Sequence, residues 1–129
     1  MSDRWQFQQS TGNIYDPDGH LVFTGYAGGN LGLHPEGKNN PAMQQLHLIG
    51  PLPRGLYTMD TPVAQSQLGP FAIPLIPDPA NEMFGRGDFY IHGDRIGAPG
   101  CASDGCIIMP RQVRNLIWAS SVHTLEVVE

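Results

Sequence analysis

Positive charge is scarce in this chain of 129 residues, and so are long hydrophobic runs. Seven Lys and Arg stand against twelve Asp and Glu, which gives a formal net charge of −5 at pH 7. A nucleic-acid-binding surface needs a basic stripe that displaces counterions from phosphates, so this balance argues against nucleic acid as a partner. No apolar run approaches the roughly 18 residues that span a bilayer, which argues against insertion into a membrane.

A secretory signal peptide is also missing from the N-terminus. Met1 to Trp5 do not form a charged region followed by an apolar segment. We therefore expect synthesis in the cytoplasm without a Sec-type signal, and another route of export if the protein acts outside. The length suits a single domain over residues 1–129, which would bury about two-thirds of its unfolded surface.

Glycine and proline are abundant, with 16 Gly and 12 Pro. So many helix breakers exclude a helical bundle and favour short β-strands. Alternation and turn chemistry predict strands over residues 5–8, 12–15, 20–26, 56–59, 71–76, 89–92 and 122–128. Residues 16–19 (Asp-Pro-Asp-Gly) predict a hairpin turn, because Pro presets φ and Gly supplies positive φ. Pro74 predicts an edge position or a bulge in its strand.

One segment alone has a convincing helical period. Apolar residues recur there at i, i+3 and i+4, namely Val113, Leu116 and Ile117. Pro110 suits the first helical position, so the pattern predicts one short helix near residues 110–120 with Arg111 and Arg114 on its exposed face. The predicted fold class is mainly β with a single helix.

A cysteine and a histidine each stand in a glycine-flanked setting. Cys106 follows Ser103-Asp104-Gly105, and His92 precedes Gly93-Asp94. A free thiol with a pKa near 8.5 is about 3% thiolate at pH 7, and a neighbouring imidazole that lowers the pKa to ~6 makes it mostly thiolate. The pair predicts a cysteine enzyme in which Cys106 attacks a carbonyl carbon while His92 accepts the thiol proton and later protonates the leaving amine.

The residues just before Cys106 have candidate roles in the same chemistry. The backbone N–H groups of Gly105 and Cys106 would bind the oxyanion, because glycine permits the tight turn. Ser103 would either hydrogen-bond the substrate or hold that turn. Asp104 is either a turn residue that faces solvent or a contact for the amine of an acceptor amino acid. A carboxylate so close to the thiol raises the thiol pKa unless it points away.

Other polar residues are candidates for substrate contact. Arg86 would bind a substrate carboxylate such as that of diaminopimelate, or form an ion pair with Asp88 or Asp94. Asp94 itself would contact substrate or orient His92. The Gly-, Asn- and Pro-rich stretch 27–41 is either the wall of a cleft, in which Asn39 and Asn40 offer amide groups to a peptide, or a flexible surface connection.

Several blocks of the sequence resemble a known family. They are residues 23–28, 38–41, 49–57 and 84–86, together with the runs that contain His92 and Cys106. His-Gly-Asp followed by Ser-x-Gly-Cys-Ile resembles the active-site signature of L,D-transpeptidases of the YkuD type. The whole set is similar to the Tlde-type peptidoglycan effectors of bacterial type VI secretion. Asp104 stands where many YkuD members carry His, and Ile108 where many carry Arg.

The resemblance implies a compact YkuD-like β-sandwich or barrel without cofactor or metal. It implies a thioester intermediate at Cys106 after cleavage between meso-diaminopimelate and D-Ala of a peptidoglycan tetrapeptide stem. Water, a D-amino acid or a second stem would then accept the acyl group. A backbone carbonyl would orient His92, and Tyr26 in the first block joins the substrate-binding candidates. The implied partners are the type VI secretion apparatus and a periplasmic immunity protein, and the implied destination is the periplasm of target bacteria.

Two alternatives and one redox question stay open at this stage. His92, Asp94, Cys101 and Cys106 offer ligand types that zinc accepts, which would make the protein a metal-dependent peptidase. The protein could instead be a non-catalytic β module that binds peptidoglycan or another protein. A Cys101–Cys106 disulfide would block the nucleophile, provided that the two Cα atoms lie within about 7 Å.

Overall fold

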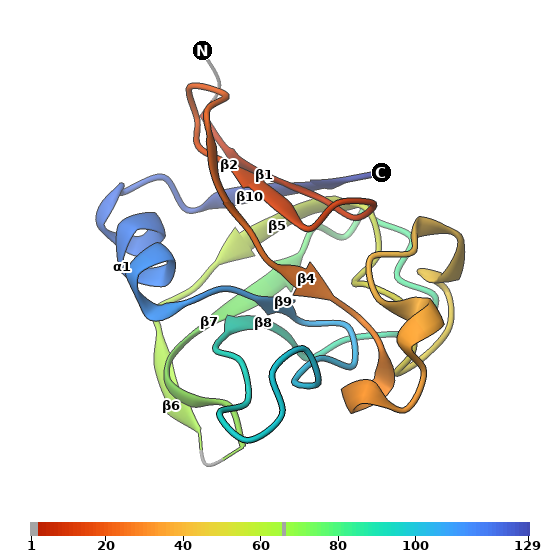
Figure 1. Ribbon diagram of the computed structural model, residues 1–129. Helices are drawn as coiled ribbons and strands as arrows, with labels where there is room; N and C mark the ends of the chain where they lie inside the picture. Colours follow the sequence, from red (N-terminus) through yellow and green to blue (C-terminus); the bar gives the residue numbers. More distant parts are fainter. Residues whose placement is uncertain (1–2, 66) are drawn as a thin grey trace.

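The computed structural model describes residues 3–65 and 67–129, and its strands form one sheet that curls into a nearly closed barrel (Figure 1). The strand order is β3-β2-β1-β10-β5-β7-β8-β9-β4, and β6 pairs with β7. The strands are β1 (Trp5–Gln8), β2 (Asn13–Tyr15), β3 (Leu21–Thr24), β4 (Tyr26–Ala27), β5 (Gly55–Met59), β6 (Val63–Gln65), β7 (Gly69–Pro77), β8 (Phe89–His92), β9 (Ile107–Ile108) and β10 (Thr124–Val128). The predicted fold class, mainly β with one helix, is confirmed.

The barrel closes at Gly25, the single residue between β3 and β4. These two strands stand at opposite ends of the strand order although they are neighbours in the chain. A Cβ atom on Gly25 would overlap the Ile108 carbonyl oxygen, and one on Gly12 would overlap the Gly25 carbonyl oxygen. Only glycine permits such close approach of backbones. The strand predicted over residues 20–26 is therefore two short strands, because the chain passes at Gly25 from one edge of the sheet to the other.

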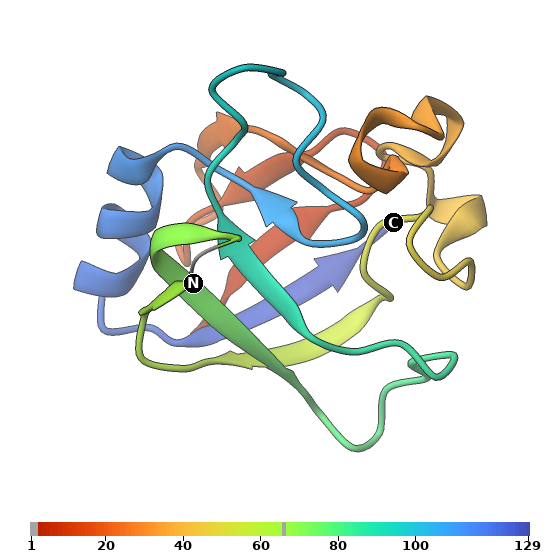
Figure 2. The ribbon, with the colours of Figure 1, turned by 90° about the horizontal axis from the view of Figure 1, so that it is seen from below.

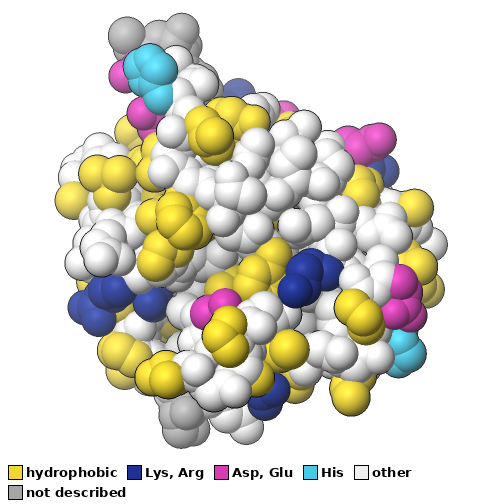
Figure 3. Space-filling view, viewed as in Figure 1, with side chains coloured by type: hydrophobic (Ala, Val, Ile, Leu, Met, Phe, Trp, Pro, Cys, Tyr) yellow, Lys and Arg dark blue, Asp and Glu magenta, His cyan; other side chains and the backbone are white. Residues whose placement is uncertain are grey.

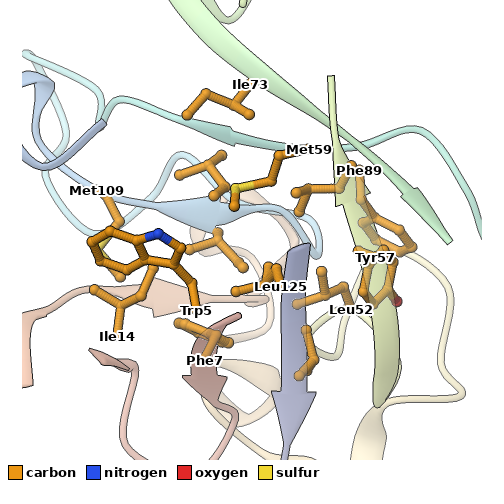
Figure 4. Close-up of a cluster of buried hydrophobic side chains, with 14 of the residues drawn as sticks. Trp5, Phe7, Ile14, Leu52, Tyr57, Met59, Ile73, Phe89, Met109 and Leu125 are labelled. Atoms are coloured by element: carbon orange, nitrogen blue, oxygen red, sulfur yellow. The ribbon is translucent and has the colours of Figure 1, made fainter. Parts of the chain in front are cut away.

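The interior of the barrel is filled by apolar side chains from almost every strand. Figure 4 shows Trp5 and Phe7 of β1 close to Leu125 of β10, with Leu52 and Tyr57 on the far side of that residue. All of these side chains are at most 2% exposed. Burying one large apolar side chain contributes roughly 1.5–3 kcal/mol. The strands that carry the candidate site are thus fixed on a well-packed core.

The prediction that Pro74 marks an edge or a bulge is wrong. β7 is an interior strand that pairs with β5 on one side and β8 on the other, and Pro74 lies opposite Tyr90. The pairing with β5 ends at Leu75, and the pairing with β6 begins at Ala72. Just beyond the β5 pairing, the Pro74 carbonyl oxygen accepts from the Asp60 N–H at 3.0 Å, so the strand stays paired on both sides and lacks only the return bond that proline cannot donate.

The one α-helix among the described residues is α1 (Arg111–Ala119), which Pro110 precedes as the N-cap residue. Val113 and Ile117 are buried as the pattern predicts, whereas Leu116 is 53% exposed. The prediction that Arg114 is exposed is wrong. Its guanidinium is buried and donates to the carbonyl oxygens of Met109, Pro70 and Phe71, so it ties the helix to the start of β7. In residues 3–65 and 67–129, no helix combines the length and apolarity that a membrane crossing needs.

Candidate active site

His92 and Cys106 are brought together by the parallel pairing of β8 with β9. Ile91 pairs with Ile107, and His92 pairs with Ile108. Cys106 immediately precedes this pairing, so it lies one strand away from His92 and two residues back along the sheet. From the strand spacing and the rise per residue, the two Cα positions are roughly 8 Å apart. Both side chains are 4% exposed, at the end of a rigid pair of strands.

The His92 ring is oriented by a backbone carbonyl. Its Nδ1 lies 2.9 Å from the Gly93 carbonyl oxygen, which can only accept, so Nδ1 carries the proton and Nε2 is the acceptor nitrogen. Burial lowers the pKa of His92 below its ordinary value of 6.5, and the nearby charge of Arg114 lowers it further. The hydrogen bond to Gly93 opposes this shift without cancelling it. His92 is therefore neutral at pH 7, as a general base must be.

The Cys106 thiol points at the edge of β8. Its Sγ donates to the Asp88 carbonyl oxygen at 3.8 Å, and the nearby Tyr90 N–H favours the thiolate. Burial raises the pKa of the thiol to about 12, and the charges of Asp104 and Asp88 add to this effect. The expectation of a thiol pKa near 6 is therefore wrong for this state. Desolvation of the thiolate outweighs the favourable Tyr90 N–H and the distant charge of Arg86.

The resting pair consequently consists of a neutral thiol and a neutral imidazole. Within the part of the chain that the structure describes, no hydrogen bond joins the Cys106 thiol to His92. Proton transfer to Nε2 requires that the thiol rotate away from Asp88 or that a water molecule bridge the two groups. This state therefore differs from a preformed thiolate–imidazolium pair.

Ser103 holds the turn that leads to the nucleophile. Its hydroxyl donates to the Cys106 carbonyl oxygen at 2.6 Å and accepts from the N–H groups of Gly28 and Gly105 at 2.8 and 3.0 Å. Of the two roles that the sequence left open, this geometry is the one that holds the turn. The Gly105 N–H already donates to Ser103, so it is not available to an oxyanion in this state.

Arg86 also stabilises the turn that leads to Cys106. Its Nη1 donates to the carbonyl oxygens of Gln44 and Pro51, and its Nη2 donates to those of Gly50 and Asp104. All four terminal N–H groups are thus used, and Arg86 forms no ion pair with Asp88 or Asp94 among the described residues. The side chain is 8% exposed, so a contact with a substrate carboxylate would first have to break one of these bonds.

Close packing against Arg86 explains why glycine stands at position 105. A Cβ atom there would collide with the Arg86 Nη2 and with the Phe89 ring, and the residue has φ +144°. Glycine is the residue that accepts both the crowding and the positive φ. The Gly-Cys pair in the sequence thus reflects the packing of the nucleophile turn on a buried guanidinium.

Asn39 and Asn40 stabilise the loop that they belong to. The Asn39 Oδ1 accepts from the Ala27 N–H at 3.0 Å, and the Asn40 Oδ1 accepts from the Ala42 N–H at 3.1 Å. Between β4 and β5 the chain forms three short 3-10 turns, η1 (Asn30–Gly32), η2 (Pro35–Gly37) and η3 (Pro41–Met43). The stretch is therefore an ordered wall whose asparagine amides are directed at its own backbone.

A second loop, residues 94–102, faces that wall. Tyr26 donates its hydroxyl to the Asp94 carboxylate at 2.6 Å and accepts from the Ala102 N–H at 2.9 Å. Asp94 also accepts from the N–H groups of Arg95 and Gly100. Burial opposes ionisation of Asp94, but these hydrogen bonds outweigh it and lower its pKa. In Figure 2 the loop after β8 lies beside the 3-10 turns. A hydrogen bond from the Leu31 N–H to the Ser103 carbonyl oxygen joins η1 to the segment that follows this loop.

Two cavities flank the nucleophile turn, and Asp104 lines both. The larger has a volume of about 700 Å³ and is lined by His92, Asp94, Arg95 and Asp104, with Leu31 and Ile96 at its rim. The smaller, of about 230 Å³, lies on the other side and is lined by His47, Leu48, Asp88 and Asp104. An extended peptide that passes over Asp104 would occupy both cavities. The imidazole faces only the larger one.

Neither the zinc set nor the disulfide is formed. Among residues 3–65 and 67–129, the group whose His, Cys, Asp or Glu ligand atoms lie within 4.8 Å of one another is Asp16, Asp18 and His20 in the β2–β3 hairpin, away from His92 and Cys106. Both cysteines are free thiols, and the Cys101 side chain lies against Gly32.

On the face seen in Figure 3, the Lys and Arg side chains are separated by apolar and uncharged ones and form no stripe.

Comparison with known families matches this architecture to one of them. The family model of the Tlde1 domain covers residues 23–129, which includes both cavities and the nucleophile turn. This protein belongs to the Tlde1 domain family. Comparisons with curated proteins and with solved structures gave no match. Membership associates the chain with the effectors of type VI secretion, which confirms that part of the resemblance found in the sequence.

Two residues that line the cavities of this Tlde1 domain were not among the site residues predicted from the sequence. Arg95 lines the larger cavity beside His92, and Asp88 lines the smaller one while its carbonyl contacts the Cys106 thiol. A signal existed for Arg95, because it directly follows the His-Gly-Asp run that begins at the last residue of β8. Asp88 has φ +59°, a backbone state that the sequence does not reveal.

Proposed function

We propose that this Tlde1-domain protein is a cysteine enzyme that cleaves the bond between meso-diaminopimelate and D-Ala in peptidoglycan tetrapeptide stems. The observation that carries the proposal is the placement of His92. Its imidazole is neutral, is held in one tautomer by Gly93, and lines a 700 Å³ cavity beside the turn that ends at Cys106. A base, a nucleophile and a peptide-sized space are the three requirements of this reaction.

The first half-reaction would be acylation of Cys106. The thiol proton passes to the Nε2 of His92 as Sγ attacks the diaminopimelate carbonyl carbon, and the Cys106 N–H binds the oxyanion. When the tetrahedral intermediate collapses, the C–N bond breaks and His92 returns its proton to the amine of D-Ala. The products are free D-Ala and a thioester on Cys106.

The second half-reaction would return the enzyme to its resting state. Water gives a tripeptide stem, so that the enzyme acts as an L,D-carboxypeptidase. A D-amino acid gives an exchanged tetrapeptide, and a second stem gives a crosslink, which are L,D-transpeptidase reactions. In each case His92 takes a proton from the acceptor and passes it to the departing thiolate. Trimming and exchange both remove donor stems from the cell wall, which suits an antibacterial effector better than crosslinking does.

The secretion context adds a compartment and a partner to the proposal. The type VI apparatus would deliver the protein into the periplasm of a neighbouring bacterium, where the substrate lies. A producing cell would need an immunity protein in its own periplasm, and the economical way to inhibit is to plug the cleft and hold its wall at residues 28–40. Expression with an added periplasmic signal should then be toxic, whereas cytoplasmic expression should not be. Equal toxicity from both compartments would contradict a cell-wall target.

The direct test is incubation with purified muropeptides, followed by mass spectrometry. We expect tetrapeptide stems to lose D-Ala, or to exchange it when a D-amino acid is added. Cys106→Ala should abolish both reactions, and Cys101→Ala is the matched control that should keep them. Tetrapeptides that remain unchanged between pH 6 and 9 would overturn the proposal.

A second function has one observation in its favour. A thiol that is 4% exposed with its pKa raised to about 12 is also what an inert structural cysteine looks like. A non-catalytic peptidoglycan-binding module would bind tetrapeptide stems equally well with Cys106 and with Ala at that position, without releasing D-Ala. The muropeptide assay distinguishes this module from the enzyme.

A further inference from the structure

The larger cavity contains a cationic side chain without a partner. Arg95 is exposed and lines this cavity together with His92. The guanidiniums of Arg86 and Arg114 are directed at backbone carbonyls, and those of Arg4 and Arg54 form ion pairs. Among the described residues, the Arg95 side chain has neither a hydrogen bond nor an ion pair.

The backbone of Arg95 is nevertheless fixed. Its N–H donates to the Asp94 carboxylate at 2.8 Å, and the same carboxylate accepts from the Tyr26 hydroxyl and from the Gly100 N–H. These donors occupy Asp94, which therefore holds the base of the loop rather than neutralising the guanidinium. The structure thus presents a free cation on an anchored backbone at the edge of a cavity that already contains the catalytic imidazole.

The position of His92 decides which part of the substrate enters this cavity. In the proposed reaction the imidazole protonates the leaving amine, so the leaving amino acid must lie on the His92 side of Cys106. In a tetrapeptide stem that amino acid carries a free carboxylate only one carbon away from its amine. An unpaired guanidinium binds a carboxylate especially well, because it donates two parallel N–H···O hydrogen bonds to the two carboxylate oxygens.

We propose that Arg95 binds the terminal carboxylate of the leaving D-amino acid and restricts the enzyme to stems that end at that residue. The inference rests on the proposed function and adds to it a specificity determinant. The same contact receives the carboxylate of an incoming D-amino acid during exchange. A stem that continues beyond this position, or that ends in an amide, offers no charge to Arg95 and is a poor substrate.

The test compares two substrates that differ in one group. Tetrapeptide stems with a free C-terminal carboxylate and with a C-terminal carboxamide are given to the unaltered protein and to Arg95→Ala, Arg95→Lys and Arg111→Ala. Arg111 is exposed on α1 and serves as the matched control. The measured quantity is kcat/KM for release of alanine or alaninamide.

We expect the unaltered protein to prefer the carboxylate roughly 10- to 100-fold, the range expected of hydrogen bonds to a charged group. Arg95→Ala should bring this preference close to one by raising KM for the carboxylate substrate alone. Arg95→Lys should keep part of the preference, and Arg111→Ala should keep all of it. A preference that Arg95→Ala leaves unchanged would overturn the assignment of Arg95 while the proposed function stands. Absence of turnover of both substrates by the unaltered protein would overturn both.

Discussion

The two strands that carry the candidate site and the loops around them are stabilised in different ways. In β8 and β9 the backbone pairs within a sheet, and the side chains of Ile91 and Ile107 are fully buried in the core. The loops have little regular structure. Polar side chains hold them instead, of which Arg86, Ser103 and Asn39 donate to or accept from backbone groups far along the chain.

This difference teaches how to interpret polar residues near a site. Asn39, Ser103 and Arg86 are the types of residue that bind a peptide, yet each is occupied by the backbone of a loop. In a loop, no neighbouring strand supplies hydrogen-bond partners for the buried backbone N–H and C=O groups. Side chains therefore have to supply them. Among the described residues that line the larger cavity, Asp104 and Arg95 have no side-chain hydrogen bond to the loops, and the Nε2 of His92 is likewise unused.

The largest expected effect is a loss of turnover when His92, at the end of β8, or Cys106, just before β9, is replaced. Cys106→Ala should remove all turnover of tetrapeptide stems, because no other group replaces the attacking thiol. His92→Ala should lower kcat by about 10²–10⁴-fold, which is the usual contribution of a general base. Cys101→Ala, in the loop, should keep most activity. Loss of activity in Cys101→Ala equal to that in Cys106→Ala would show that the wrong cysteine was assigned.

Arg86→Met should give the largest loss of stability in the loops. It removes four hydrogen bonds and leaves four carbonyl oxygens without their donor, two of them in buried residues, so we expect a loss of about 3–5 kcal/mol. The measurement is urea unfolding followed by fluorescence. Arg111→Met on the exposed face of α1 is the control and should change stability by less than about 0.5 kcal/mol. A similar small change for Arg86→Met would mean that the loops do not depend on this guanidinium.

Ser103→Ala should have a smaller effect on stability and a distinct effect on catalysis. It leaves the N–H groups of Gly28 and Gly105 without an acceptor, and we expect a loss of about 1–3 kcal/mol in all. The turn before Cys106 would loosen, so kcat should fall more than KM rises. Kinetics with tetrapeptide stems, together with urea unfolding, separate the two effects. Unchanged kcat in a destabilised variant would show that the turn does not position the nucleophile.

The smallest expected effect is a difference in pH dependence. Because the pKa of Cys106 is raised, its thiolate fraction at pH 7 is lower than that of an ordinary thiol, and alkylation by iodoacetamide should be slow and accelerate up to about pH 12. Because the pKa of His92 is lowered, the neutral base persists at pH 7, and turnover should fall only as the pH drops well below 6.5. Fast alkylation of Cys106 at pH 6–7 in Cys101→Ala would instead indicate a preformed thiolate–imidazolium pair.

Much of the fold could be predicted because it depends on local patterns. Alternating apolar residues in β1 and β10, the extents of β8 and α1, and the glycine-flanked Cys106 and His92 all appear within a few positions of the chain. Local steric rules determine which segments extend, turn or coil. The same local motifs carried the resemblance that the match to the Tlde1 domain confirmed at the level of the family.

The tertiary structure alone decided which polar groups remain free. The guanidinium of Arg86 was expected to bind a substrate carboxylate or an acidic side chain, but it donates to carbonyl oxygens such as those of Gly50 and Asp104, which belong to two distant loops. The guanidinium of Arg114 was expected at the surface, but it donates to a carbonyl oxygen at the start of β7. The pKa of the Cys106 thiol rose because the folded chain excludes water from it. Hydrogen-bond partners and desolvation are properties of the assembled neighbourhood, since they sum over residues that no short stretch of sequence contains. Sequence by itself therefore supplied the candidate nucleophile and the candidate base, whereas the fold determined their protonation and left Arg95 as a free cation in the cavity that His92 lines.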